Sequence, residues 1–309
     1  MEKQFRQIKW DAKLEEDWRV LLRQAVRLDL DRLYDWTSAA LIPNDAIARA
    51  AVVARQNGVV AGLHAAEMVT IESDRRHRWA ALKRDGDAVR RGEEIAMVEG
   101  PARNLLSCER LLLNVLGHLS GVATLTQQYV SAVQGTKARI YDTRKTTPGW
   151  RRLEKYAVRC GGGMNHRTGL YDAVLIKDNH LAIGAACFGK TWTAAEAVGK
   201  AKAFLHDMLP PKRREAMIVE IEVDSLDHFS DVLAAEPNIV LLDNMNPAQL
   251  REAVSRRDAA IANVELEASG GVTLATVAEI ARTGVERISV GALTHSAPSF
   301  DVGLDWRTS

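Results

Sequence analysis

The segment MIVEIEVDSLDHFSDVLAAEPNIVLLD, residues 217–243, contains the repeating unit of the second half of the chain. It opens with the Val- and Ile-rich run 217–223 and closes with a second apolar run, NIVLLD (238–243). Between them, Ser225 is placed to cap a helix that continues to about Ala235. Apolar strands separated by helices are typical of a buried parallel sheet, so this segment predicts strand, helix and parallel strand.

The same alternation extends on both sides of this segment and predicts six strands. Asn246-Pro247 is typical of a helix start, because Asn caps the first turn and Pro fits its first position. The predicted strands are 138–142, 172–177, 217–223, 238–243, 263–269 and 286–292, and the predicted helices include 150–160, 191–207 and 273–282.

A polar residue or a glycine follows or ends nearly every predicted strand. In a β/α barrel the carboxyl ends of all strands converge on one face, which carries the active site. A doubly wound sheet would concentrate its site at one switch point, so the pattern favours a barrel. The residues concerned are Arg144, Lys145, Lys177, Glu222, Asp243, Ser269 and Gly291.

The first third of the chain has a different pattern and predicts a small α+β domain. Residues 10–40 are helical in pattern, and β-like runs occupy 46–63 and 94–98. A long apolar helix over 104–133 follows, in which Gly117 and Gly121 share a face and would let another backbone come close. We expect an N-terminal domain over 1–113, a barrel over 114–296, and a return of 297–309 to the first domain.

Composition limits the location and the partners of the protein. The chain has 309 residues and a formal net charge of +1, so no global field attracts it to nucleic acid or membrane. Its start lacks the apolar core of a secretory signal, and no apolar run is long enough to span a bilayer. Its three cysteines form no Cys-x-x-Cys pair and are interpreted as free thiols. We therefore expect a cytoplasmic protein that binds neither nucleic acid nor membrane.

Basic residues form the first candidate site. Arg110 has Leu106 and Leu113 as its same-face neighbours, which suggests either a bound anion or a structural salt bridge. Arg144 and Lys145, which follow the predicted strand 138–142, suit an anion but are also typical of a solvated loop. The glycines at 161–163 allow either a close approach of the backbone to a ligand or a flexible connection. The basic set is Arg110, Arg144, Lys145, His166, Arg167 and Lys177.

Acidic residues and glycines form two further candidate sites. Glu220 and Glu222 share a strand face, and Glu222 and Asp243 end neighbouring strands. Such a pair could hold Mg²⁺, bind sugar hydroxyls or stabilise a cationic transition state, or form ordinary salt bridges. His180 lacks a second ligand at metal-binding spacing. Backbone N–H groups at 269–271 and 291–292 could cradle a phosphate, although each stretch is also typical of an ordinary turn.

Seven stretches of this chain resemble the quinolinate phosphoribosyltransferase family and occur in the family's order. They are DGDAVRRGEEIAMVEGPARNLLSCERLLLNVLGHLSGVATLT (85–126), DTRKTTPG (142–149), YAVRCGGGMNHRTGLYDAVLIKDNH (156–180), IEVDS (221–225), LLDN (241–244), ASGGV (268–272) and SVGALTHS (289–296). The resemblance covers about residues 50–300 and implies an N-terminal α/β domain and an open seven-stranded α/β barrel in a dimer. We identify six strands from the sequence, and the seventh is supplied by analogy.

The resemblance also implies roles for single residues. Arg110 would reach the active site of the partner subunit, and Lys145, Glu222 and Asp243 would be catalytic. The last two would also face the ribose and Mg²⁺. The quinolinate carboxylates would be held by Arg110, Thr143, Arg144, His166, Arg167 and Lys177. Phosphoribosyl pyrophosphate would be held by Lys145, Glu222, Asp243, Ser269, Gly270, Gly271, Gly291, Ala292 and His295.

The implied activity is a decarboxylating transfer that makes nicotinate mononucleotide, pyrophosphate and carbon dioxide, a step in NAD biosynthesis. Two departures stand out. Tyr34 precedes Asp35 where the family has Gly, and residues 184–216 form a long insertion that we expect to add helix outside the barrel. Alternatives are a nicotinate-specific relative, a non-catalytic binding protein, and a Schiff-base enzyme that uses Lys177.

Overall fold

The computed structural model describes residues 3–31 and 33–307, and it divides into two compact units. Unit 1 contains the described residues of Met1–Gln7, Gln128–Arg144 and Met164–Ala292. Unit 2 contains the described residues of Ile8–Gln127, Lys145–Gly163 and Leu293–Ser309. The predicted domain boundaries at 113 and 296 stay a prediction.

Unit 1 is built on a sheet of six parallel strands, as the sequence predicts. The order in the sheet is β6-β11-β10-β9-β8-β7. Pairing is in register along neighbouring strands, for example between Ser269 and Asp243. The strands are β6 (Arg139–Tyr141), β7 (Val174–Ile176), β8 (Val219–Val223), β9 (Ile239–Asp243), β10 (Glu265–Ser269) and β11 (Arg287–Ser289).

The α/β-barrel class is confirmed, but the seventh strand is not formed among the described residues. In its place, Met164 makes an isolated parallel bridge with Tyr141 of β6. No pairing joins β6 to β7 in the described part of the chain, so the sheet is open between them. The three glycines at 161–163 directly precede the bridge, and glycine disfavours extended strand. The seventh position is therefore reduced to one pair.

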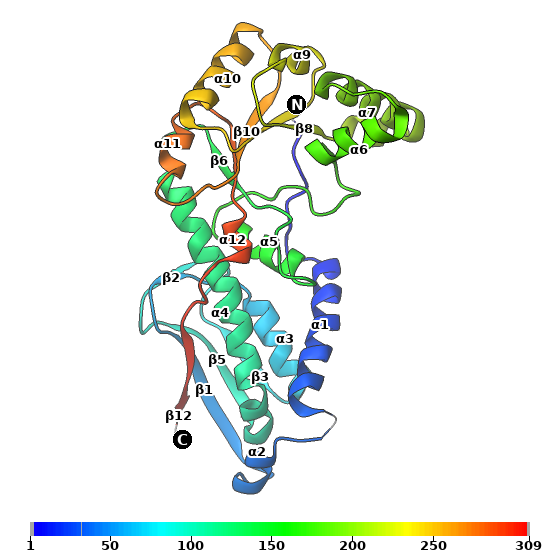
Figure 1. Cartoon of the computed structure of the whole chain (residues 1–309). Coiled ribbons are helices and arrows are strands. Elements are labelled where there is room, and N and C mark those ends of the chain that lie inside the picture. The colour runs from blue at the N-terminus through cyan, green and yellow to red at the C-terminus, as the bar shows by residue number, and fades with distance from the viewer. Residues whose placement is uncertain (1–2, 32, 308–309) are drawn as a thin grey trace. The chain divides into compact units, whose positions relative to one another are not determined.

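Helices connect the strands of unit 1 (Figure 1). The predicted cap is confirmed at α10, where the Asn246 side chain accepts hydrogen bonds from the backbone N–H groups of Ala248 and Gln249. The insertion at 184–216 is helical as predicted, and its helix α7 packs against β7 and β8. The helices are α6 (Asp178–Phe188), α7 (Ala194–Met208), α8 (Pro211–Ala216), α9 (Phe229–Ala234), α10 (Pro247–Ala259) and α11 (Val277–Ala281).

Two predicted helix starts are wrong. Ser225 does not cap α9, because the residues after β8 form turns and the helix begins only after His228, which has a left-handed φ of 56°. Similarly, α11 begins at Val277 and not at Thr273, since residues 273–276 form a turn in which the Thr276 hydroxyl accepts from Thr273 N–H. Both loops are longer than the helix pattern suggests.

Unit 2 contains a four-stranded antiparallel sheet, in the order β12-β1-β5-β3, and a two-stranded β2-β4 ribbon. The C-terminal strand β12 pairs with β1 along its length. The elements are α1 (Ala12–Leu30), α2 (Trp36–Leu41), β1 (Ile47–Ala54), β2 (Gly58–Val59), α3 (Leu63–Ser73), β3 (Arg78–Ala81), β4 (Ala88–Val89), β5 (Glu94–Pro101), α4 (Ala102–Ala132, of which 102–127 lie in this unit), α5 (Arg151–Cys160), α12 (Ala292–His295) and β12 (Val302–Arg307).

The close backbone approach predicted for α4 is confirmed. A Cβ atom on Gly121 would lie 2.1 Å from the carbonyl oxygen of Pro298, and one on Gly117 would lie 2.8 Å from Ser299 Oγ. Tyr34, the departure from the family pattern, is exposed and keeps a negative φ, so this position does not require glycine. Asp35 beside it caps α2 by accepting from the backbone N–H groups of Thr37 and Ser38.

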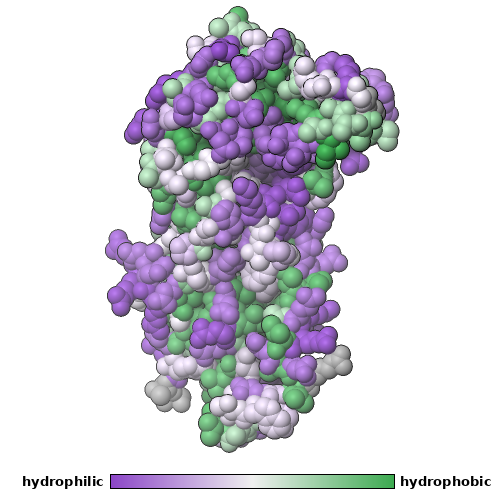
Figure 2. Space-filling model, in the orientation of Figure 1, coloured by the Kyte–Doolittle hydropathy of each residue, from purple (hydrophilic) through white to green (hydrophobic). Residues whose placement is uncertain are grey.

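The visible face in Figure 2 is mostly covered by hydrophilic residues, with small hydrophobic patches between them. Among the described residues, no helix is both long enough and apolar enough to cross a membrane. The apolar side chains of unit 1 are instead withdrawn into its sheet, where Val240, Leu242 and Leu266 are fully buried.

Candidate functional site

The predicted site residues of unit 1 lie at one edge of its sheet. Asp243 and Ser269 end β9 and β10, Glu222 lies near the end of β8, and Lys177 directly follows β7. Arg144 follows β6 after two residues. Because all six strands are parallel, these positions share the carboxyl edge, where barrel enzymes carry their sites.

Two guanidinium groups lie near each other at this edge. Arg167 is buried, and burial together with the positive charge of Arg144 lowers the pKa of its guanidinium. Arg167 Nη1 donates to the carbonyl oxygen of Ala173 at 3.2 Å. The buried Nε of Arg144 has no hydrogen-bond partner among the described residues. Two cations with spare donors in a partly buried place are suited to an anion with more than one negative charge.

His166 belongs to a buried ionic network inside the sheet. Its Nε2 lies 3.1 Å from Glu220 Oε2 and 3.4 Å from Glu267 Oε1. Its ring stacks on Phe5 from the N-terminal segment, with the ring centroids 4.4 Å apart. Arg287 donates to Glu267 at 2.7 Å, and Ser289 also donates to that carboxylate. The network holds the ring in one orientation directly before Arg167.

Burial and neighbouring charges shift the pKa values of the two carboxyl groups of this network. Burial raises the pKa of Glu220. Burial also opposes ionisation of Glu267, but the positive charges of His166 and Arg287 outweigh it and lower the pKa of that carboxyl. The backbone N–H of Arg167 donates to His166 Nδ1 at 2.8 Å, which turns Nε2 of the ring towards Glu220. Three side chains of the network, those of His166, Glu220 and Glu267, could each offer an atom to a metal ion, and these atoms lie within 4.8 Å of one another. Because Arg287 already neutralises the charge of Glu267, we interpret the three residues as an ion-pair network and not as a metal site.

Lys177 and Glu222 form an ion pair across β7 and β8. The register explains it: Ile176 is opposite Ile221, so the next residues on both strands are neighbours. Glu222 and Asp243 line one cavity of about 410 Å³, together with Asp178, Asp224 and Trp192. Four carboxylates around one cavity are hard oxygen donors of the kind that Mg²⁺ prefers, so the residues present fit this ion.

The glycine loop after β10 requires glycine at one position. Gly270 has a φ of 92°, and a Cβ there would lie 2.1 Å from Asn244 Oδ1 and 2.9 Å from Asn244 N. The N–H of Asn244 donates to the carbonyl oxygen of Ser269 at 2.8 Å, which ties this loop to the loop after β9. Gly271 has a φ of 60° and no atom within 4 Å of its Cβ position, so it faces open space.

The predicted phosphate site after β10 lies in a loop, whereas we expected it at the start of a helix. Since α11 begins four residues later than predicted, Ser269, Gly270 and Gly271 lie in a loop and not at a helix start. The loop can offer N–H groups to a phosphate, but without an adjoining helix dipole. At the last strand, Gly291 follows β11 and Ala292 begins the short helix α12.

Three predicted site residues lie in unit 2. Arg110 is exposed on α4, and no described residue forms an ion pair with it, so the alternative of a structural salt bridge within this chain is not supported. Lys145 is exposed, and its carbonyl oxygen accepts from the Thr294 hydroxyl at 2.7 Å. His295 Nδ1 lies 2.6 Å from Ser296 Oγ. Thr143, in unit 1, is half-buried.

Sequence reasoning missed four acidic or aromatic neighbours of the site. Asp224 follows β8 directly and Asp178 is the second residue after β7, so the rule that polar residues at strand ends converge could have found them. Glu267 and Phe5 had no such signal, because their partners are far away in the chain. His180, considered as a metal ligand, instead accepts the backbone N–H of Lys177 at 2.9 Å at the start of α6.

The parallel α/β sheet and its carboxyl-edge cluster of cations, carboxylates and a glycine loop define an α/β-barrel protein built to hold polyanionic small molecules. The chain belongs to the quinolinate phosphoribosyl transferase family. The model of the family's N-terminal domain matches residues 35–120, and the model of its C-terminal domain matches residues 122–305.

Named relatives cover nearly the whole chain. A nicotinate-nucleotide pyrophosphorylase [carboxylating] of Mycobacterium leprae is 43% identical over 289 residues, which is 93% of this chain and 96% of that protein. A probable enzyme of the same name from Bacillus subtilis is 40% identical over 83% of this chain and 82% of its own length. The solved structure of the nicotinate-nucleotide pyrophosphorylase from Francisella tularensis has a TM-score of 0.85 at 34% identity, covering 98% of this chain and all of the other.

Proposed function

We propose that this chain is a decarboxylating quinolinate phosphoribosyltransferase in NAD biosynthesis, as the names of its relatives indicate. It would convert quinolinate and phosphoribosyl pyrophosphate to nicotinate mononucleotide, pyrophosphate and carbon dioxide. The observation that carries the proposal is that two neighbouring guanidiniums, Arg144 and Arg167, and a carboxylate-lined cavity occur at the same edge of the sheet, since each part suits one of the two substrates.

The basic residues would bind and orient quinolinate. The pair Arg144 and Arg167 would take its two carboxylates, with Lys177, His166 and Thr143 beside them, and a second carboxylate explains why two guanidiniums are kept near each other. Lys177 is paired with Glu222 in the structure, so an incoming anion would compete for that ammonium. A dicarboxylate held in this way would present its ring nitrogen in a fixed direction, and orientation of this kind contributes several kcal/mol to catalysis, ~7–11 kcal/mol at most.

The acidic residues would act on the ribose. The pyridine nitrogen has a free lone pair and needs no general base when it attacks the ribose C1. The C1–O bond to pyrophosphate breaks with the electron pair on oxygen, and Glu222 and Asp243 would stabilise the cationic ring at that stage. Mg²⁺, when bound by carboxylates of this cavity, would neutralise pyrophosphate charge. Lys145 would contact the leaving group, and the loops at 269–271 and 291–292, with His295, would hold the 5′-phosphate.

Carbon dioxide is then lost from the quaternised ring. The positive nitrogen accepts the electron pair of the breaking C2–carboxylate bond, and C2 takes a proton from solvent. The carboxylate at C3 remains, so the organic product is nicotinate mononucleotide. The residues would contribute chiefly by keeping the ring in place, because the driving force is in the substrate.

We also propose a homodimer in which Arg110 serves the active site of the partner subunit. Its support is that Arg110 is exposed and forms no ion pair with a described residue. Large apolar side chains are exposed on the same unit, including Tyr34 (54%), Trp36 (64%) and Leu41 (74%), as in a surface that a second copy covers. The three free cysteines support a reducing compartment, the cytoplasm.

The test is a mass-spectrometric product assay with phosphoribosyl pyrophosphate and Mg²⁺, in which quinolinate and nicotinate are offered separately. We expect nicotinate mononucleotide from quinolinate and none from nicotinate. Product from nicotinate alone would assign the chain to a monocarboxylate substrate. Formation of a Schiff base at Lys177 is tested in parallel by borohydride, and we expect no trapped adduct.

A further inference from the structure

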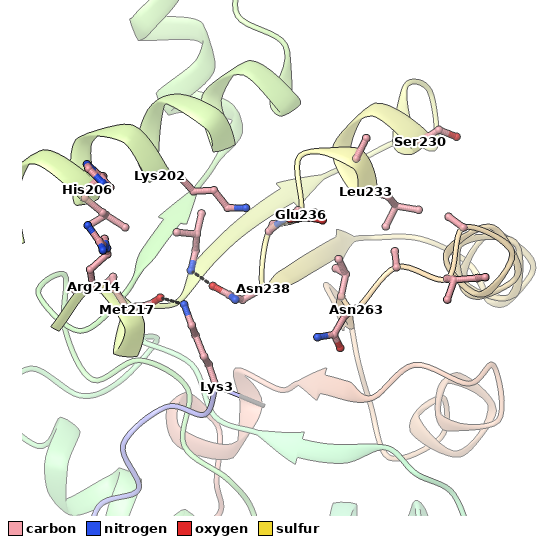
Figure 3. A pocket seen from close by; sticks show the side chains of 18 residues that line it. Lys3, Lys202, His206, Arg214, Met217, Ser230, Leu233, Glu236, Asn238 and Asn263 are labelled. Carbon is pink, nitrogen blue, oxygen red and sulfur yellow. Dashed lines mark hydrogen bonds between the residues drawn. The ribbon is translucent and has the colours of Figure 1, made fainter. Parts of the chain in front are cut away.

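A second pocket lies at the opposite edge of the unit 1 sheet, where strands begin (Figure 3). It has a volume of about 760 Å³. Val219 begins β8, Asn238 directly precedes β9, and Val264 directly precedes β10, and all three line it. A five-residue strand spans ~16 Å. This pocket is therefore separated from the carboxyl-edge site by the length of the sheet.

Basic side chains from three separate segments converge on this pocket. Lys3 comes from the N-terminal segment, Lys202 and His206 from α7, and Arg214 from α8. Lys3, Lys202 and Arg214 are each half-buried. Burial and the nearby charge of Lys202 lower the pKa of Lys3, although Glu215 partly opposes this effect. Cations that repel one another in a partly buried place are unfavourable unless an anion joins them.

These groups retain hydrogen-bond donors. Lys3 Nζ donates to the carbonyl oxygen of Met217 at 2.9 Å, and Lys202 Nζ donates to that of Ala235 at 2.9 Å. Each ammonium has three donors, so further ones remain. Asn238 Oδ1 accepts a hydrogen bond from Val219 N–H at 2.9 Å (Figure 3). This bond does not use the two N–H donors of the Asn238 amide. Glu236 is the one acid among the described residues that line the pocket.

The rest of the lining is apolar. Leu205, Leu233 and Val264 are buried at its wall, and Met217 is half-buried beside Lys3. The pocket thus joins a cationic part to an apolar part. Its volume falls in the range of small-molecule sites, ~300–1,000 Å³.

We propose that this pocket is a second binding site for a phosphorylated small molecule that also carries an aromatic ring, such as a ribonucleoside monophosphate. Lys202, Arg214 and Lys3 hold its phosphate, because together they offer charge and several N–H donors to one dianion. The wall of Leu205, Leu233 and Met217 covers its base. The inserted segment 184–216 supplies three of the four basic side chains, which gives a role to the insertion. The site is independent of the proposed reaction.

Methionine methyl groups allow a test that separates the two sites. Met217 lines this pocket, whereas Met245 lies two residues after β9 at the carboxyl edge. The full chain is labelled with ¹³C-methyl methionine and titrated with AMP, and in a second series with inorganic phosphate. The test variant is Lys202→Gln with Arg214→Gln. The matched control is Lys212→Gln with Arg213→Gln, which also alters the insertion but not the pocket lining.

We expect a saturable shift of the Met217 methyl signal with AMP, and a smaller one with phosphate. The test variant should weaken this binding at least tenfold for each cation removed, while the control keeps the wild-type affinity. Unfolding midpoints of both variants establish that they fold. A shift confined to Met245, or a Met217 shift of equal affinity in the test variant, would overturn the proposal. Failure of the quinolinate assay would leave this result unaffected.

Discussion

Replacing Gly270 by Ala tests the glycine loop at the carboxyl edge, and Gly271→Ala is its matched control. The Cβ introduced by Gly270→Ala would lie 2.1 Å from Asn244 Oδ1 and 2.6 Å from Asn244 Cγ. Asn244 can rotate its amide away, but its backbone nitrogen at 2.9 Å cannot rotate. The new Cβ and the Asn244 nitrogen can therefore reach an ordinary contact distance only if the loops after β9 and β10 separate by several tenths of an ångström. Gly271→Ala meets no atom within 4 Å and suffers only the cost of its φ of 60°, ~1–2 kcal/mol.

We expect the displaced loop to reduce kcat/KM for phosphoribosyl pyrophosphate by about tenfold, since a misplacement of about 1 Å costs about a hundredfold and this one is about half as large. The KM for quinolinate should change little, because its predicted ligands are on other loops. Steady-state kinetics with each substrate varied in turn measure both effects. Gly271→Ala should stay within a fewfold of wild type. Equal losses in both variants, or activity of Gly270→Ala within threefold of wild type, would refute the reasoning from this contact.

Three further predictions concern the ionic network, the partner subunit and the thiols. Glu267→Gln should lower the free energy of unfolding by up to ~3–5 kcal/mol, because it removes the fully buried counter-charge of Arg287 and leaves only Glu265, whose side chain is 20% exposed. Urea denaturation measures this loss, and a loss below ~1 kcal/mol would contradict the network. Arg110→Ala and Lys177→Ala should each be inactive yet folded, and mixing them should restore part of the activity by subunit exchange; no recovery after demonstrated exchange would argue against a shared site. Burial raises the pKa of Cys108 to about 11, so at pH 8 its alkylation should be about a hundredfold slower than that of an ordinary exposed thiol, while exposed Cys187 is modified first. Equal labelling of Cys108 and Cys187 would contradict the burial of Cys108. Since the Cys108 thiol ionises near pH 9 in the unfolded chain, the folded protein should also become less stable as the pH rises from 9 towards 11.

The strands and the convergence of polar residues at their ends follow from local pattern. The interior of a run such as NIVLLD, residues 239–242, is apolar because both faces of a parallel strand are buried, so the position of the strand could be predicted. The cap at Asn246 could also be predicted, because it depends only on this side chain and the first turn of the helix that follows it. The helix starts predicted at Ser225 and Thr273 were wrong because residues that cap helices also favour turns before a helix. Tertiary packing decides between these two structures.

The buried network could not be predicted, because it depends on register between distant segments. Glu267 meets Arg287 since the two are opposite each other on β10 and β11. Phe5 reaches His166 from a segment more than 150 residues away, and no periodicity shows this contact. The pairing of Lys177 with Glu222 likewise depends on the register of β7 and β8. The residue types of the site were visible in the sequence, whereas their partners were not.

The most direct test of the central claim uses quinolinate labelled with ¹³C in its 2-carboxylate. The label is followed into carbon dioxide and into the nucleotide product during turnover with phosphoribosyl pyrophosphate and Mg²⁺. We expect one labelled carbon dioxide for each nicotinate mononucleotide, with no label left in the nucleotide. A nucleotide that retains the label, or the absence of any nucleotide from quinolinate, would contradict it.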